Sequence, residues 1–352
     1  RVIREFLPQR DLLSYLEAIL RVYNQHGRRD NLYKARIKIL VKALGPEKFR
    51  EQVEAEWEHI KDSGLVLDEA EIERVRGYFA PPPYEAGAAR DLSLDQWLKG
   101  DKSFAAWVRH NVAEHKVAGY RNVFVALKEP GTPPGDITAD QMDAVADLAD
   151  RYSFGRIRAT HHQNLLLADV RHADLYPLWH ALEARKLAAP VIGTLADMIC
   201  CPGLDFCSLA NAGSIAVAHQ INEKFDRLDC LYDLGDIRLN MSGCMNACGH
   251  HHVGHIGILG VDKKGEEWYQ ISLGGSSEND VALGDILGPS VPKIEVANTL
   301  ERILRVYVER REDGERFIDT LRRIGLEPFR VRAYAPGGSE AKQEEQRYAV
   351  GY

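Results

Sequence analysis

Apolar residues recur at helical spacing in four stretches of the first eighty residues. The first stretch begins after Asp11, a residue type that can cap a helix, and ends at Gly27, a common helix terminator. Its apolar positions are Leu12, Leu13, Leu16, Ile19, Leu20 and Tyr23. Three further helices are expected from Lys34 onward and over 47–61 and 69–79, and Gly45-Pro46 separates the first two of them. These patterns predict a helical segment over residues 1–80.

A different periodicity dominates residues 119–194. Val123, Val125 and Leu127 alternate with other residues and predict a strand, and Thr138 with Gln141 forms a capping-box pattern before a helix. Two short strands are expected over 156–160 and 164–168. A second helix is expected over 172–186 and a final strand over 190–194. The resulting order, β-α-β-β-α-β, is that of the ferredoxin-like split βαβ fold.

Three consecutive prolines, Pro81 to Pro83, separate these two regions. Proline cannot continue a helix and favours an extended spacer, so we expect a domain boundary at about residues 80–92. We expect a helical segment over 1–80 and a linker with short helices over 81–118. The ferredoxin-like repeat follows over 119–194, then a further α/β domain over 195–335 and a mobile tail over 336–352. The fold class is therefore α+β.

The region after residue 195 mixes strands and helices. Ile237, Leu239 and Met241 alternate and predict a strand that ends at Ser242. A helix is expected before this strand, over 210–225, and a β-hairpin after it, over 253–273. A long amphipathic helix is expected near the end of the chain, over 294–309.

Composition and charge exclude several classes of protein. Charged residues make up 28% of the 352 residues and the net charge is −7, so nothing points to nucleic acid or to a membrane surface. Six cysteines are too few for a disulfide scaffold, and no secretory signal is present. Paired cysteines then favour metal or redox chemistry in a reducing compartment, and we expect a cytoplasmic protein. The chain lacks an initiating Met, so a fragment or processed product is expected.

Four of the cysteines form two pairs, Cys201 with Cys207 and Cys244 with Cys248. The second pair is expected on one helical turn, where residues four apart share a face. Four thiolates favour an iron–sulfur cluster, while a zinc site and structural or redox thiols remain alternatives. Cys200 and Cys230 are expected to be buried, inert thiols. We interpret the four nearby histidines as pocket or packing residues: His250, His251, His252 and His255.

Two polar segments are candidates for binding an anion. The segment from Arg158 to Asn164 reads Arg-Ala-Thr-His-His-Gln-Asn, which is either a polar turn or a row of donors facing a polyanionic ligand. The basic cluster is either a solvated helix face or an anion-binding face, and consists of Arg28, Arg29, Lys34, Arg36 and Lys38.

The two cysteine pairs, with Asn246 inside the second and Gly249 after it, resemble the signature of the nitrite/sulfite reductase hemoprotein family. The segment from Phe124 to Leu167 resembles the second ferredoxin-like repeat of that family, and the basic N-terminal helices resemble the end of its first half. The similarity covers roughly residues 1–330. It implies an α/β siroheme and iron–sulfur domain after the ferredoxin-like repeat, with siroheme and a 4Fe–4S cluster as cofactors.

The resemblance also implies roles for individual residues. Cys201, Cys207, Cys244 and Cys248 would hold the cluster, and Cys248 would bridge it to the siroheme iron. Asn246 and the backbone N–H groups near Ser242 and Gly243 are the expected hydrogen-bond donors around the cluster. Siroheme carries eight carboxylates, and its expected partners are Arg158, Gln163, Asn164, Arg36 and Lys38.

The implied reaction is the six-electron reduction of sulfite to sulfide, with nitrite to ammonia as the alternative. Ferredoxin or a flavoprotein reductase would supply the electrons. In this family the cations that grip the substrate come mostly from a first half that this sequence lacks, so we expect a C-terminal portion that is inactive alone. Two rivals are a haem-free 4Fe–4S electron carrier or sensor and a zinc-stabilised binding module.

Overall fold

The computed structural model describes residues 2–85, 92–225 and 227–335. It divides into two compact units, Arg1–Tyr84 and Glu85–Tyr352. Part of the expected boundary at 80–92, residues 86–91, and the expected mobile tail at 336–352 lie outside the described residues. Among the described helices, none has the length and apolar character needed to cross a membrane.

The first unit is helical, as the apolar spacing predicts. Its helices are α1 (Leu12–His26), α2 (Ile37–Leu44), α3 (Pro46–Ile60) and α4 (Glu69–Gly77), with 3-10 turns at Gln9–Asp11 and Leu32–Lys34. Helices α1, α2 and α3 share a core of Tyr15, Ala18, Val22, Leu40, Phe49, Val53, Trp57 and Ile60. Asp11 occupies the predicted N-cap position of α1, but it also ends a 3-10 turn and its side chain accepts no capping hydrogen bond.

The second unit begins with helices α5 (Leu92–Gly100) and α6 (Lys102–Asn111) and continues into a ferredoxin-like sheet. Its strands are β1 (Val112–Glu114), β2 (Tyr120–Val125), β3 (Arg158–Ala159) and β4 (Leu165–Arg171), and its helices are α7 (Ala139–Tyr152) and α8 (Leu175–Glu183), with a 3-10 turn at His172–Asp174. The strands are antiparallel in the order β1-β2-β4-β3. The capping box of Thr138 and Gln141 is present at the start of α7. The ferredoxin-like prediction is confirmed in outline.

The prediction of a strand at 190–194 is wrong. Val191 donates its N–H to Ala189 and Thr194 donates to Val191, so the segment folds into turns. Pro190 has no N–H to contribute to a ladder. Strand β1, which precedes the repeat, takes the position beside β2 instead.

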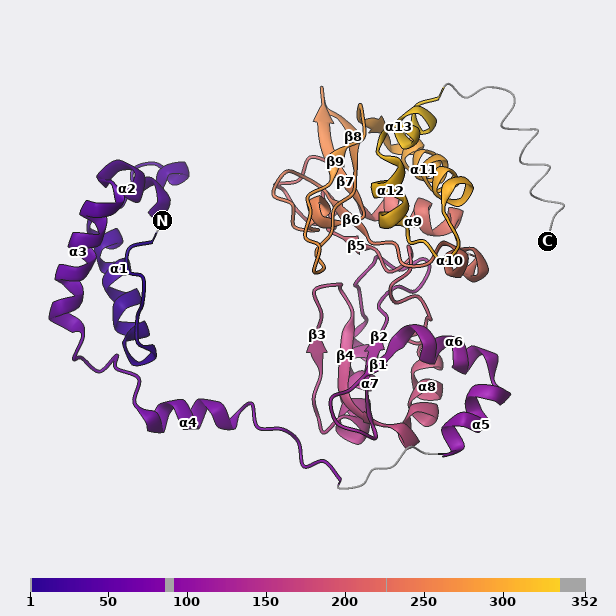
Figure 1. Ribbon diagram of the computed structural model, residues 1–352, viewed down its shortest axis with the longest axis horizontal. Coiled ribbons are helices and arrows are strands. Elements are labelled where there is room, and N and C mark those ends of the chain that lie inside the picture. Colours follow the sequence, from indigo (N-terminus) through magenta and orange to yellow (C-terminus); the bar gives the residue numbers. More distant parts are fainter. Residues whose placement is uncertain (1, 86–91, 226, 336–352) are drawn as a thin grey trace. The chain divides into compact units, whose positions relative to one another are not determined.

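The rest of the second unit is a six-stranded mixed sheet with helices packed against it (Figure 1). Its strands are β5 (Ile199–Cys200), β6 (Leu239–Ser242), β7 (Ile256–Lys263), β8 (Glu266–Leu273), β9 (Asp285–Ile286) and β10 (Val291–Pro292). The order is β10-β8-β7-β6-β5, and β9 pairs with β8. Strands β5, β6 and β7 run parallel, whereas β7 and β8 form the predicted antiparallel hairpin.

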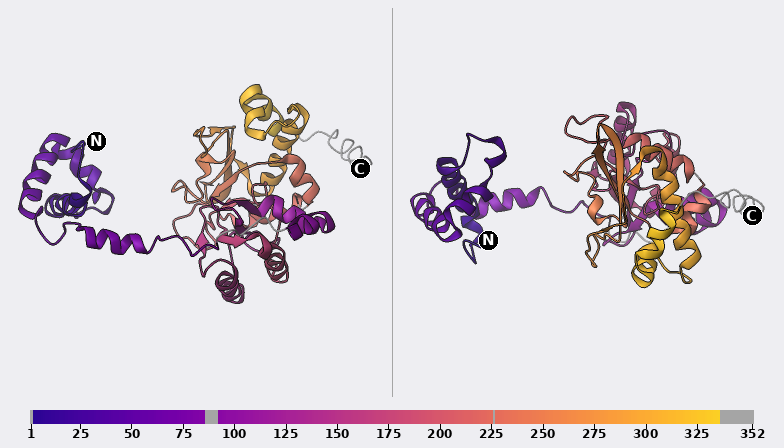
Figure 2. Two further views of the ribbon diagram at one scale, coloured as in Figure 1. Left: turned by 60° about the horizontal axis from the view of Figure 1, so that its bottom comes forward. Right: turned by 90° about the horizontal axis from the view of Figure 1, so that it is seen from above.

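The helices of this region are α9 (Ile215–Lys224), α10 (Leu228–Leu234), α11 (Val296–Arg310), α12 (Phe317–Ile324) and α13 (Glu327–Ala333), with 3-10 turns at His251–Val253 and Lys293–Glu295. Figure 2 shows the C-terminal helices beside the strands of this sheet. Buried residues from β6, β7, β8 and α11, such as Met241, Ile258, Ile271 and Ile303, join one core. The two sheets of the second unit, each with its helices, confirm the α+β class.

Candidate functional site

Two short parallel strands deliver the two cysteine pairs to one edge of the second sheet. Cys201 follows β5 directly, and Cys244 follows β6 after one intervening residue, Gly243. Since the carboxyl ends of parallel strands lie at the same edge, the loops that follow them are neighbours. The N–H of Cys201 donates to the carbonyl of Met241 in β6 at 3.0 Å, which continues the pairing into the first cysteine loop.

The two cysteine loops also bond to each other. The N–H groups of Asn211 and Ala212 both donate to the carbonyl oxygen of Gly243, at 2.9 and 3.1 Å. A Cβ atom at Gly243 would lie 2.6 Å from the Cα of Gly203, so this contact needs glycine. The loop around the first pair therefore rests on the turn that carries the second pair.

The prediction that Cys244 and Cys248 share a helical turn is wrong. Ala247 has a φ of 57° and His250 a φ of 53°, which lie in the left-handed region and interrupt an α-helical path. A turn replaces the helix, with the N–H of Ala247 donating to Cys244 O at 3.1 Å. The N–H of Gly249 donates to Ser242 Oγ at 3.1 Å, which fixes the turn to the end of β6.

The fold brings the four cysteines of the two pairs together. Cys244 is buried, Cys201 and Cys207 are partly buried, and Cys248 is exposed. Partial desolvation and then the neighbouring thiols of Cys201, Cys244 and Cys207 raise the pKa of Cys248. A cationic metal centre would reverse this effect, because it stabilises thiolates.

The donor set suits a cluster of several irons. A zinc ion draws its sulfur ligands to about 2.3 Å from one point, whereas a 4Fe–4S cluster uses four thiolates, each on its own iron. Four neighbouring thiols on two loops that bond to each other match the number of ligands that the cluster takes.

The other two cysteines differ from each other. Cys200 is buried, and burial raises the pKa of its thiol to about 12, as expected of an inert thiol. Cys230 was expected to be buried as well, but it is exposed on α10. Its helix carries its apolar side chains Leu231 and Leu234 into the core, and Cys230 lies off that face. Of the histidines after the second pair, His251 and His255 are buried and the other two are exposed.

The amides of Gln163 and Asn164 bind protein groups. Gln163 Nε2 donates to the carbonyl of Cys200 at 2.9 Å, and the N–H of Cys200 donates to Gln163 Oε1 at 2.8 Å. Asn164 is buried, accepts from the N–H of Leu127 at 3.1 Å and donates to Asp197 Oδ1 at 2.8 Å. Both residues thus brace the interior, and their expected contact with siroheme stays a prediction.

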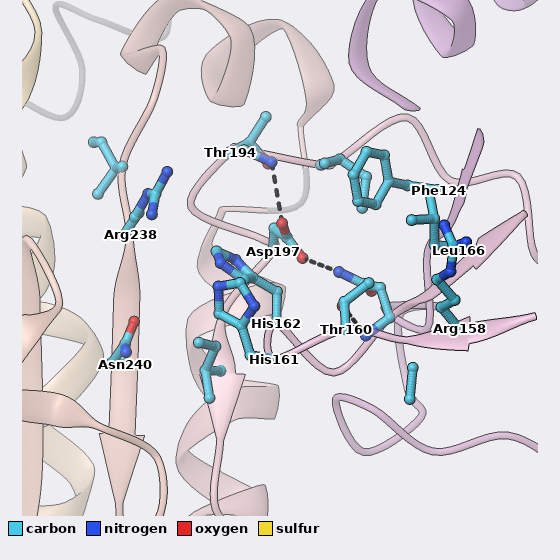
Figure 3. Close-up of a pocket in the computed structure, with 16 residues that line it drawn as sticks. Phe124, Arg158, Thr160, His161, His162, Leu166, Thr194, Asp197, Arg238 and Asn240 are labelled. Atoms are coloured by element: carbon cyan, nitrogen blue, oxygen red, sulfur yellow. Dashed lines mark hydrogen bonds between the residues drawn. The ribbon is translucent and has the colours of Figure 1, made fainter. Parts of the chain in front are cut away.

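Arg158 lines a cavity of about 530 Å³ between the two sheets of the second unit. Figure 3 shows His161 and His162 between Arg158 on one side and Arg238 on the other. The remaining lining residues are Phe124, Ala159, Thr160, Asn164, Leu166, Ile192, Gly193, Thr194, Asp197, Ile199, Ile237 and Asn240. Burial, followed by the charges of His161, Arg238 and Lys128, lowers the pKa of His162 to about 4.

Arg238 and Asp197 line the cavity and Lys128 lies close to it, bonded to His162, and none of the three was predicted from the sequence. Arg238 forms an ion pair with Glu278 at 2.6 Å. In the sequence, its position between the apolar residues Ile237 and Leu239 of a predicted strand indicated that its side chain points to the opposite face from theirs. Lys128 is buried, and its Nζ donates to the carbonyl of His162 at 3.0 Å. Burial lowers the pKa of Lys128 to about 8. Nothing in the local pattern indicated a buried lysine.

The remaining predicted residues are not among those that line the cavity. Arg36 and Lys38 are exposed on the first unit, at the start of α2 and within it, so their contact with a cofactor stays a prediction. Asn246 is exposed within the turn of the second cysteine pair. Ser242 is buried, and its hydroxyl accepts the N–H of Gly249.

The chain is similar to several known proteins. A family model described as "Nitrite and sulphite reductase 4Fe-4S domain" matches residues 1–61 and 194–335, and a "Nitrite/Sulfite reductase ferredoxin-like half domain" model matches 129–185. The chloroplastic ferredoxin–nitrite reductase of Arabidopsis thaliana is 28% identical over 306 residues, which are 85% of this chain and 46% of the relative. A sulfite reductase (ferredoxin) of Mycolicibacterium paratuberculosis is 28% identical over 325 residues, 89% of this chain and 51% of the relative.

A solved structure is also similar. The NirA protein of Mycobacterium tuberculosis superposes with a TM-score of 0.61 at 25% identity, over 94% of this chain and 55% of that chain. The chain thus spans about half the length of the curated relatives it matches. The family's cofactors are siroheme and a 4Fe–4S cluster. Its model covers the cysteine loops and more than half of the sequence, and the chain belongs to the nitrite and sulphite reductase 4Fe–4S family.

Proposed function

We propose that this chain carries the cofactor-binding part of a siroheme-dependent sulfite reductase, an enzyme that reduces sulfite to sulfide with six electrons. The observation that carries the proposal is the meeting of two cysteine loops at the ends of β5 and β6. The sulfite reductase of Mycolicibacterium paratuberculosis, which aligns with 89% of the chain, supports sulfite as the substrate.

In this proposal Cys201, Cys207, Cys244 and Cys248 hold the 4Fe–4S cluster. When bound, the cluster supplies electrons one at a time. Cys248 is the most exposed thiol of the four, and it would also be the ligand of the siroheme iron. The Gly249 N–H bond to Ser242 Oγ would hold the backbone next to Cys248 in place when the metal centres are bound.

The cavity residues have a separate role in the proposal. Arg158 is exposed at the cavity and presents a planar fork suited to carboxylates, of which siroheme has eight. Arg238 is already paired with Glu278 at 2.6 Å, so it contributes less free charge. His162, with its lowered pKa, is neutral at pH 7 and can donate or accept one hydrogen bond without adding charge.

Nitrite is the second candidate substrate. The Arabidopsis thaliana relative is a ferredoxin–nitrite reductase and aligns with 85% of the chain, close to the share for the sulfite reductase. Both relatives are ferredoxin enzymes by name, which favours ferredoxin over a flavoprotein reductase as the electron donor in our proposal.

The test is an assay of the purified full-length natural protein with reduced methyl viologen, with sulfite and nitrite side by side. We expect a chlorin-type visible spectrum and a higher kcat/KM for sulfite. A higher value for nitrite would replace the substrate, and a cluster signal without a chlorin band would favour the haem-free electron carrier. Zinc without acid-labile sulfide would favour the binding module.

Cys248→Ser tests the proposed bridging ligand. We expect turnover to fall at least about 100-fold, because a metal ligand acts more directly than the outer-shell partners whose loss costs 10–100-fold. Cys230→Ser is the matched control, since Cys230 is also exposed but lies on α10. Full activity of Cys248→Ser, or an equal loss in Cys230→Ser, would contradict the assignment.

A further inference from the structure

Gln163 makes a matched pair of hydrogen bonds with the backbone N–H and carbonyl of one residue, Cys200, which directly precedes the first cysteine loop. Its amide nitrogen donates to the carbonyl of Cys200 at 2.9 Å, and its amide oxygen accepts the N–H of Cys200 at 2.8 Å. The two residues come from different parts of the fold, because Gln163 lies in the turn between β3 and β4 and Cys200 ends β5. Cys200 is the residue directly before Cys201.

The direction of these bonds follows from strand geometry. Successive residues of a strand direct their N–H groups to opposite edges. The N–H of Cys201 donates to Met241 in β6, so the N–H and carbonyl of Cys200 point to the opposite edge of β5. No further strand lies beyond that edge in the described strand order. The amide of Gln163 therefore makes the hydrogen bonds to Cys200 that a neighbouring strand would make.

The surroundings hold the Gln163 side chain in this orientation. Its backbone has a φ of 57°, and its N–H donates to the carbonyl of Thr160 at 3.3 Å. The buried Lys128 Nζ donates to the carbonyls of His162 and Gln163, at 3.0 and 3.4 Å. The next residue, Asn164, is buried and bonded to Leu127 and to Asp197. The turn is therefore anchored on the ferredoxin-like side before it reaches Cys200.

We propose that Gln163 is a positioning residue for the cluster, which acts through the backbone of Cys200 to fix where Cys201 presents its sulfur. This inference rests on the proposed function, because it requires that Cys201 binds the cluster. It gives Gln163 a different role from the contact with siroheme expected from the sequence. It also makes the ferredoxin-like repeat a direct support of the cysteine site.

The experiment uses the full-length protein and compares two substitutions at Gln163. Gln163→Leu keeps a similar volume and removes both bonds, whereas Gln163→Glu keeps the acceptor for the Cys200 N–H and loses the donor to its carbonyl. The readouts are the rate of cluster loss to an iron chelator, followed by absorbance, and the midpoint potential of the cluster, followed by electron paramagnetic resonance. We expect cluster loss about tenfold faster in Gln163→Leu, equivalent to about 1.4 kcal/mol, and an intermediate rate in Gln163→Glu.

Gln141→Leu is the matched control. Gln141 also makes two side-chain bonds to backbone in the ferredoxin-like repeat, accepting from Thr138 N at 3.1 Å and donating to Arg185 O at 2.9 Å, but it does not touch the cysteine loops. We expect its cluster to be lost at the wild-type rate. If both glutamine positions give the same rate and potential while the wild type holds a cluster, the positioning role is overturned and the proposed function stands. A wild type that binds no cluster would overturn both.

Discussion

At the scale of single residues, His162 lies in the cavity among three other basic groups. Burial and the charges of His161, Arg238 and Lys128 lower its pKa to about 4 from an ordinary value of 6.5. The imidazole is therefore neutral at pH 7, and the fixed positive charge of the cavity comes from Arg158 and Arg238. A polyanion placed in the cavity would favour the protonated imidazole and raise the pKa of His162.

We expect His162 to make the protein without cofactor less stable in mild acid. Between pH 6.5 and pH 4 the unfolded chain protonates this histidine and the folded protein does not, so the free energy of unfolding falls as the pH falls. His162→Gln should flatten that dependence, as measured by urea unfolding at several pH values across the window. His26→Gln, an exposed histidine of α1, controls for the loss of an imidazole. An unchanged slope in His162→Gln would contradict the expectation.

The types of the residues from Arg158 to Asn164 predict only part of what these residues do. A cluster of Arg, His, Gln and Asn indicated more than a surface turn, and Arg158 and His162 do line the cavity. The roles of Gln163 and Asn164 could not be predicted, because an amide offers both a donor and an acceptor and suits backbone as well as ligand. Gln163 accepts from the N–H of Cys200 and Asn164 accepts from the N–H of Leu127, and both partners are distant in the sequence.

At the scale of elements, the turn after β6 depends on close contact at Gly249. An added methyl group there would collide with the carbonyl oxygen of Met241 and approach Ser242 Oγ at 3.1 Å. We expect Gly249→Ala to cost about 1–3 kcal/mol in the free energy of unfolding, because the strand and the turn must move apart. The iron content should fall with it, since Cys248 adjoins the strained peptide.

Thermal unfolding and iron analysis of Gly249→Ala test this expectation, with Gly100→Ala as the control. Gly100 ends α5 and has no atom within 4 Å of the added methyl, so its substitution should leave both measurements close to those of the wild type. Wild-type stability and iron content in Gly249→Ala would show that the turn has more room than its contacts indicate.

Helices were easier to predict than strands for a physical reason. A helix such as α1 or α11 buries one face over many residues, so its apolar spacing is visible in the sequence. Strands β1, β3 and β5 have two or three residues each, too few for an alternating pattern. The segment at 190–194 had strand-like composition, but its position beside β2 was taken by β1.

At the scale of the whole molecule, each unit has a hydrophobic core of its own. Phe49, Val53 and Trp57 belong to the core of the first unit and share no residue with the cores of the second. Phe49 is 2% exposed, and we expect Phe49→Ala to cost about 3–5 kcal/mol. The loss should be confined to the first unit.

The measurement for Phe49→Ala is the iron-to-protein ratio together with circular dichroism. We expect reduced helical signal and retention of the cluster iron, because the four cysteines lie on the second unit. Cys244→Ala is the variant for comparison. We expect it to lose iron and to keep the helical signal of the first unit. Equal loss of iron in both variants would mean that the first unit is required for the cluster to be held.

The sequence was most informative about the order of segments and the cofactor class. Cysteine spacing and the ferredoxin-like repeat led to a family that the comparisons support. The cavity was beyond prediction, because Arg158, Asp197 and Arg238 come from three separate segments that only the folded second unit unites.

The parallel pairing of β5 and β6 has a consequence for how the protein matures in the cell. Parallel neighbours need a crossover, and here it contains α9 and α10, so the first cysteine pair leaves the ribosome well before its partner strand. Until β6 emerges and pairs, Cys201 and Cys207 lack the other two ligands. We therefore expect iron and sulfide to enter late, into a scaffold that is already folded, through the side on which Cys248 is open to solvent.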